Sequence, residues 1–214
     1  GGRDPGKLQP EKIEAEICKS AEEYLQEMVS RHPELEGISR QISEAYEVLR
    51  KSYESGGKLL TCGNGGSAAD AEHIVGELMK GFHLKRPLGQ ERKEQLGEMA
   101  HHLQEALPAI PLTQNQVLST AYANDVEPDM IFAQQVYGYG QDGDVLIALT
   151  TSGNSKNVFC AAEVAVKKHM KVIGFTGAGG GRLKEVADIC ICVPETETAF
   201  IQEKHIIVYH TLCS

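Results

Sequence analysis

One stretch of the sequence, residues 59–77, constrains the fold more than any other: LLTCGNGGSAADAEHIVGE. A short apolar run ends in a Gly/Asn turn, and after Ser67 the apolar residues return at helical spacing. This order predicts a strand, a tight loop and a helix, the unit from which parallel sheets are built. It also places a small anion site and two polar helix residues, His73 and Glu77, on one short piece of backbone.

The same alternation of strand and helix continues along the chain. Five short apolar runs are expected to be strands: residues 58–62, 109–112, 145–150, 172–176 and 188–194. We therefore predict an α/β fold with a doubly wound, five-stranded parallel sheet and right-handed crossovers. In such sheets, ligands bind beyond the carboxyl ends of the strands, near the point where the strand order reverses. The loops 63–67 and 150–155 both follow such ends.

Two amphipathic helices precede the first strand. The chain is expected to divide into a tail, a helix pair and an α/β domain: residues 1–10, 11–55 and 56–214. We expect the tail to be disordered or added for expression, and the helix pair to serve oligomerisation. The first helix should stop near Arg31, because Pro33 disfavours helix in the residue before it. Within the domain, a polar segment at about 88–107 carries Leu96, Met99 and Leu103 at helical spacing, which predicts an inserted helix.

Composition excludes several classes of partner. A net charge of −9 without a block of like charges argues against nucleic acid, because phosphate neutralisation needs clustered Lys and Arg. No segment approaches about 18 uninterrupted apolar residues, so we expect no membrane span. None of the six cysteines forms a C-x-x-C pair, and we expect reduced thiols in a cytoplasmic protein. The six are Cys18, Cys62, Cys160, Cys190, Cys192 and Cys213.

The loop 150–155, TTSGNS, is the strongest candidate for a phosphate site. It supplies four hydroxyls at the start of a helix, where free amides and the helix dipole favour an anion. The simpler interpretation is helix capping by Ser152 or Ser155. The loop holds no Lys and no nucleoside-triphosphate motif, so a phosphate on a small molecule fits better. The run GAGGG at 177–181 is only part of a dinucleotide fingerprint, and we expect no nucleotide cofactor.

Polar residues on two helices are candidates for catalysis or metal binding. His73 and Glu77 are four residues apart and share a helix face, and the last helix carries Gln202, His205 and His210. Such a set could hold a divalent metal, although a surface pair and a core histidine are the simpler interpretations. Gln202 and His210 are separated by about 12 Å along a helix. If both are ligands, we infer that the site draws the last helix from two subunits.

Several motifs together resemble those of the phosphoheptose isomerases of the sugar isomerase (SIS-domain) superfamily. They are CGNGGS, the H-x-x-x-E that follows it, AND at 123–125, TSGNS, and IQExH with a His five residues on. The match runs from about residue 57 to 213, and the leading helix pair is similar to helices that build a tetramer core in that family. The resemblance implies a SIS-type αβα sandwich, a homotetramer with sites at subunit interfaces, and one zinc ion per site. It also implies conversion of sedoheptulose 7-phosphate to D-glycero-D-manno-heptose 7-phosphate through an enediol.

The resemblance also implies a role for each matched residue. The phosphate-binding positions are Thr150, Thr151, Ser152 and Ser155. The sugar contacts are Asn64, Gly65, Gly66, Ser67, Glu77, Asn124, Asp125 and Gln202. The proton-transfer pair is Glu77 and His210, and the zinc ligands are His73, Glu77, Gln202 and His210.

Two departures from the family keep other functions open. The insertion at about 88–107 is longer than expected and follows the helix that bears Glu77. Phe200 stands where family members commonly have Arg. An isomerase of another phosphosugar is the first alternative, and a non-catalytic phosphosugar-binding or protein-binding SIS protein is the second. A binder has no need for Glu77 and His210 together, which favours an enzyme.

Overall fold

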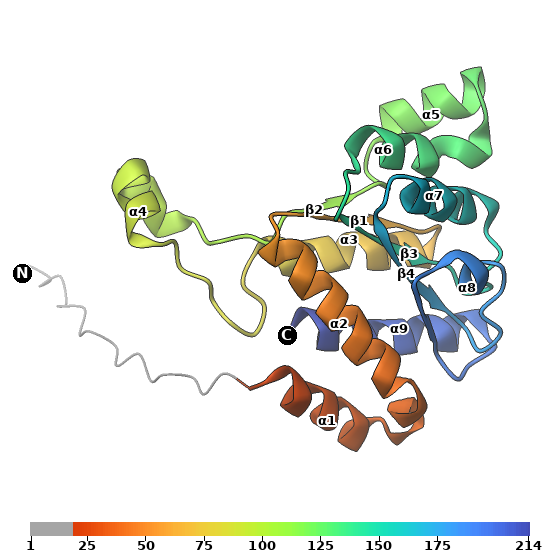
Figure 1. Cartoon of the computed structure of the whole chain (residues 1–214), viewed down its shortest axis with the longest axis horizontal. Helices are drawn as coiled ribbons and strands as arrows, with labels where there is room; N and C mark the ends of the chain where they lie inside the picture. The colour runs from red at the N-terminus through yellow and green to blue at the C-terminus, as the bar shows by residue number, and fades with distance from the viewer. Residues whose placement is uncertain (1–18) are drawn as a thin grey trace, which may run out of the picture.

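A single parallel sheet forms the centre of the molecule in the computed structural model, which describes residues 19–214. Its strands are β1 (Leu59–Cys62), β2 (Ala109–Pro111), β3 (Val145–Leu149), β4 (Lys171–Thr176) and β5 (Ile189–Cys192). Their spatial order is β2-β1-β3-β4-β5, and every neighbouring pair is parallel. Figure 1 shows helices on both faces of this sheet. The prediction of a doubly wound, five-stranded parallel sheet is confirmed.

The inner strands explain why the sheet is covered on both faces. All residues of β1 and β3 are buried, as expected for parallel strands between two helical layers. The two strands are neighbours, with Thr61 opposite Ile147. The Thr61 hydroxyl donates to the carbonyl oxygen of Ala71 at 3.0 Å, which ties the strand to the helix that follows it. The strand order reverses between β1 and β3, so the switch point lies where the sequence analysis places it.

Two helical layers bury the sheet. One layer packs α1 (Ala21–Arg31), α2 (Ser39–Glu54), α3 (Gly66–Met79) and α9 (Thr198–Cys213) around a shared apolar core. The other layer packs α6 (Ile131–Tyr139), α7 (Lys156–Lys167) and α8 (Leu183–Val186) around a second core. The remaining elements are α5 (Gln116–Asp125) and the 3-10 helices η1 (Pro33–Ile38) and η3 (Pro128–Met130). Within residues 19–214, no helix is long and apolar enough to cross a membrane.

The first helix differs in part from its prediction. Residues 1–18, with the predicted tail, the first turns of the helix and Cys18, lie outside the described residues. Helix α1 begins at Ala21 because Ser20 is extended and forms a capping box with Glu23. A helix running unbroken through Ser20 is therefore wrong. The end at Arg31 is confirmed, and Pro33 opens the 3-10 helix that follows.

The inserted segment is not one helix. It contains α4 (Gln90–Leu96) and the 3-10 helix η2 (Gly97–His102), and the break falls at Gly97, whose φ is +57°. A left-handed residue ends the α-helical hydrogen bonding, so the continuous helix predicted from the leucine spacing is wrong. Pro87 and Gln104 form a bridge at the base of the insertion. In Figure 1 the α4 region projects away from the sheet.

Candidate active site

A cavity of about 300 Å³ lies at the switch point of the sheet. Three segments line it: the loop after β1, the loop after β3 and the first turns of α9. The lining residues are Asn64, Gly65, Gly66, Ser67, Leu149, Thr150, Thr151, Ser155, Thr198 and Gln202. The structure thus brings together most of the residues assigned to substrate. Thr198 lines the cavity as well, and the sequence offered no signal for it beyond its place next to the last helix.

Three helices direct their N-termini at this cavity. Helices α3, α7 and α9 begin after Gly65, Ser155 and Glu197, and none of these residues caps its helix through its side chain. Some first-turn amides are already bonded: Ser67 and Ala68 donate to the carbonyl oxygens of Asn64 and Gly65, and Val158 donates to Asn157 Oδ1. The remaining first-turn N–H groups lack intrahelical partners, and together with the helix dipoles they attract an anion. Among the described residues, no Lys or Arg lines the cavity. The groups that the cavity offers to an anion are therefore backbone N–H groups and hydroxyls.

The hydroxyls of the 150–155 loop face one another. Thr150 Oγ1 lies 2.9 Å from Ser155 Oγ and 3.5 Å from Ser152 Oγ. Ser152 Oγ accepts from the Asn154 amide at 3.1 Å, which closes the turn. Capping of α7 by Ser155, the simpler interpretation of this loop, is wrong because the Ser155 hydroxyl pairs with Thr150 instead.

Two glycines make close contacts where the loops meet, and at Gly153 the neighbour is backbone. Gly66 touches Gln202 so closely that a Cβ there would lie 2.5 Å from Gln202 Nε2. Gly153 has a φ of +70°, and a Cβ there would lie 2.0 Å from the carbonyl oxygen of Gly180. Gly180 belongs to the GAGGG run, which forms a turn packed against the 150–155 loop. The first contact shows that the Gln202 side chain lies against the start of α3.

A pair of asparagines joins the two loops. Asn64 Nδ2 donates to Asn157 Oδ1 at 2.8 Å, and Asn157 Nδ2 donates back to Asn64 Oδ1 at 2.9 Å. Asn157 was missed by sequence reasoning because it sits inside the first turn of α7, beyond the hydroxyl motif. Its reciprocal bonds hold the Asn64 side chain at the edge of the cavity.

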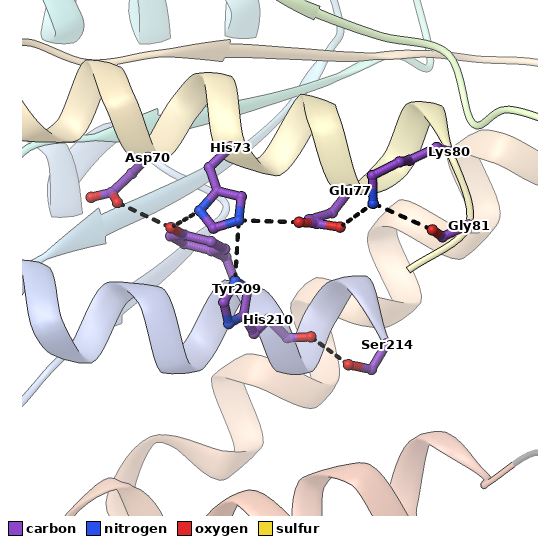
Figure 2. A network of polar contacts seen from close by, with 8 residues as sticks. All are labelled: Asp70, His73, Glu77, Lys80, Gly81, Tyr209, His210 and Ser214. Carbon is purple, nitrogen blue, oxygen red and sulfur yellow. Dashed lines mark hydrogen bonds and ion pairs between the residues drawn. The ribbon is translucent and has the colours of Figure 1, made fainter. Parts of the chain in front are cut away.

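The second group of candidate residues lies farther along α3 and α9, which run side by side (Figure 2). His73 Nε2 is 3.1 Å from Glu77 Oε1 and 3.4 Å from His210 Nε2. Burial favours the neutral form of Glu77, but Lys80, at 3.1 Å, and His73 outweigh it and lower the carboxyl pKa. Burial and the nearby His73 lower the pKa of His210. The cluster therefore offers an ionised carboxylate beside a neutral imidazole.

Two buried residues support this cluster and were missed by sequence reasoning. The Tyr209 hydroxyl donates to Asp70 Oδ1 at 3.1 Å and lies 2.9 Å from His73 Nδ1. Tyr209 and Asp70 are 1% and 7% exposed. A signal was present, since Asp70, His73 and Glu77 share one face of α3 at spacings of three and four residues.

The cavity and the His73 cluster are separate within one chain. Gln202 lies against Gly66 at the start of α3, whereas His210 lies against His73, two turns farther along both helices. That offset is about 12 Å. Asn124 and Asp125, assigned to the sugar, end α5, where their side chains bond each other at 2.7 Å; neither lines the cavity.

The donor types of the expected zinc ligands, imidazole, carboxylate and amide, suit a divalent metal. Within residues 19–214, however, no group of three or more His, Cys, Asp or Glu forms a metal-holding cluster. His73, Glu77, Gln202 and His210 do not converge within one chain, because Gln202 lies with Gly66. His205, the other candidate on α9, is fully buried, with Nε2 3.2 Å from the carbonyl oxygen of Thr176.

Fold and site together define a class of protein. The family model described as the SIS domain matches residues 23–177. Among solved structures, the chain is similar to a phosphoheptose isomerase from Francisella tularensis, at 34% identity and a TM-score of 0.73, covering 89% of this chain and 92% of that one. A phosphoheptose isomerase from Neisseria gonorrhoeae gives 34% identity and a TM-score of 0.71 over the same shares.

Comparison with sequence relatives identifies one family within the class of SIS-domain proteins. The chain is 49% identical over 172 residues to a phosphoheptose isomerase from Rhodospirillum rubrum, covering 80% of this chain and 82% of that relative. It is 40% identical over 182 residues to one from an Azoarcus species, covering 84% and 83%. The chain belongs to the phosphoheptose isomerase family of SIS-domain proteins, and the resemblance seen in its motifs is confirmed.

Proposed function

We propose that this protein is an aldose–ketose isomerase that converts sedoheptulose 7-phosphate to D-glycero-D-manno-heptose 7-phosphate. The observation that carries the proposal is the meeting of three uncapped helix N-termini and the paired hydroxyls of Thr150 and Ser155 in one cavity without Lys or Arg. This arrangement suits the phosphate of a small molecule. Membership of the phosphoheptose isomerase family supports the choice of heptose.

The chemistry requires a proton to move between adjacent carbons through an enediol. Glu77 is ionised and can remove that proton, and neutral His210 can exchange protons with the sugar oxygens. Thr150, Thr151, Ser152 and Ser155 would hold the phosphate end and so fix the reacting carbons. Gln202 and Asn64, both at the cavity, would contact the sugar.

The separation of the cavity from the His73 cluster within one chain supports an active site that is shared between subunits. We infer that the cavity of one subunit works with the His73 cluster of a neighbour in a homotetramer. Helix α9 supports this, because two of its large apolar side chains are exposed: Phe200 at 50% and Ile206 at 38%. Exposed apolar side chains beside a cavity are typical of a surface that another chain covers.

Zinc remains part of the proposal. His73, Glu77 and His210 of one subunit would hold the ion with Gln202 of a neighbour, and the ion would polarise the sugar carbonyl when bound. A cytoplasmic location is also proposed. The five described cysteines are free thiols, which suits a reducing compartment.

A direct assay tests the function. The purified protein is incubated with sedoheptulose 7-phosphate, and aldose formation is followed with and without added zinc, with Glu77→Gln and His210→Ala as control variants. We expect turnover by the native sequence and loss of turnover in both variants. Absence of turnover under all metal conditions would favour another phosphosugar or a binding role, and full activity in either variant would refute its assignment.

A further inference from the structure

Below the exposed edge of His73 lies a buried pair that no expectation from the sequence included. His73 is open to solvent, with 42% of its side chain exposed, whereas Tyr209 and Asp70 are buried. Figure 2 shows the Tyr209 hydroxyl between the Asp70 carboxylate and the imidazole of His73. These contacts connect the buried Asp70, through Tyr209, to the exposed ring of His73.

The His73 ring is hydrogen-bonded through both of its nitrogens. Tyr209 Oη is 2.9 Å from Nδ1, and Nε2 is thereby directed at Glu77 and His210, 3.1 and 3.4 Å away. Without the phenol, Nδ1 would have no described partner, and the exposed ring could turn about its side-chain torsions. An imidazole that is held through its other nitrogen presents a fixed orientation.

Asp70 anchors the phenol in turn. Its Oδ1 accepts from Tyr209 at 3.1 Å, while its buried Oδ2 has no hydrogen-bond partner within residues 19–214. Tyr209 packs against both histidine rings edge-on, at centroid distances of 5.3 Å from His73 and 5.1 Å from His210. A buried carboxylate bound to a single phenol is costly unless the geometry is kept.

We propose that Tyr209, anchored by Asp70, is a positioning residue that fixes the imidazole of His73 toward Glu77 and His210. The inference rests on the proposed isomerase function for its kinetic consequence but not for its structural one. Tyr209 itself does not line the phosphate cavity. Its loss should lower kcat and leave KM close to that of the native enzyme.

Tyr209→Phe is the test variant, because it removes only the hydroxyl and retains the ring packing. Tyr53→Phe is the matched control: it removes a phenol that donates to the Pro108 carbonyl at 3.3 Å, outside the cluster. We expect kcat to fall about 10- to 100-fold in Tyr209→Phe, with KM changed less than about twofold.

A second readout does not depend on turnover. Nitrogen NMR of the histidine side chains in the native protein and both variants reports the environment of the His73 nitrogens. We expect those signals to move in Tyr209→Phe and to stay in place in Tyr53→Phe. Absence of turnover in the native protein would sink the isomerase proposal while this spectrum still tests positioning. Unmoved His73 signals, an equal kcat loss in Tyr53→Phe, or a loss confined to KM would overturn the positioning role.

Discussion

The cavity at the switch point and the cluster around His73 consist of different chemical groups. The cavity uses backbone amides, hydroxyls and close glycine contacts, with no Lys or Arg in its lining. The cluster uses titratable side chains on α3 and α9, held by the buried Tyr209. A backbone site holds an anion without changing its own charge, whereas a side-chain site can exchange protons. Binding and proton transfer are thus assigned to separate places on the same two helices.

The largest expected effect is in the cluster. Glu77→Gln replaces the carboxylate that we assign as base with a neutral amide of the same shape. We expect kcat to fall about 1,000-fold, because general-base catalysis contributes on the order of 10²–10⁴ in rate. Steady-state kinetics measure it, and Glu94→Gln on the exposed α4 serves as control. A change in KM with kcat unchanged would indicate that Glu77 contributes to substrate binding and not to proton transfer.

A smaller effect concerns α9, the helix that both regions share. Burial lowers the pKa of His205 from 6.5 to about 4. The unfolded chain therefore takes up a proton near pH 6.5 while the folded protein resists until about pH 4. Stability from this residue is complete above pH 6.5 and is lost as the pH falls toward 4, by about 3 kcal/mol. Denaturant unfolding of the native protein and His205→Gln across this range measures it.

The matched control for that experiment is His101→Gln, at an exposed position in the insertion. It should unfold with the same pH dependence as the native protein. If His205→Gln loses stability between pH 6.5 and 4 as steeply as the native protein, the titrating group lies elsewhere.

The binding half is tested by Ser155→Ala. This change removes the hydroxyl that pairs with Thr150 at 2.9 Å and faces the proposed phosphate. We expect KM to rise about tenfold with kcat nearly constant, since one hydrogen bond to a charged group contributes about 1.5–3 kcal/mol. Ser55→Ala, at an exposed position after α2, is the control. A fall in kcat at constant KM would contradict the assignment of Ser155 to substrate binding.

The smallest effect is expected in the insertion, which belongs to neither region. Arg92 pairs with Glu105 at its surface, and exposed ion pairs contribute about 0–1 kcal/mol. Arg92→Ala should leave kcat and KM within about twofold and stability within about 1 kcal/mol. A larger kinetic effect would place the insertion over the site of a neighbouring subunit.

Sequence patterns predicted the sheet because its signals are local. The apolar runs that form β1 and β3, and the loops that follow them, can be recognised directly in the sequence. The alternation of strands and helices then predicts where the strand order reverses. The insertion was read wrongly because leucine spacing gave no sign of the left-handed turn at Gly97. Ser20 sets the start of the first helix and Pro33 sets its end, and the sequence pattern predicted only the end.

The candidate site was predictable where motifs lie at loop ends, and less so where partners meet across elements. Thr150 and Gly66 follow strands, so their place was inferred from topology. Asn157, Asp70 and Tyr209 owe their roles to contacts across 93, 139 and 136 residues of sequence, respectively. Such pairings arise from helix packing, and a single sequence does not display them.

We infer that the cavity of one subunit and the His73 cluster of another together form the active site. Subunit complementation tests it most directly: Glu77→Gln and Ser155→Asp, each inactive alone, are unfolded, mixed in equal amounts and refolded together. We predict that activity returns to about a quarter of the native value, since random mixing pairs two intact halves at that frequency. No recovery, in mixtures shown to contain hybrid oligomers, would contradict the claim and place both halves in one chain.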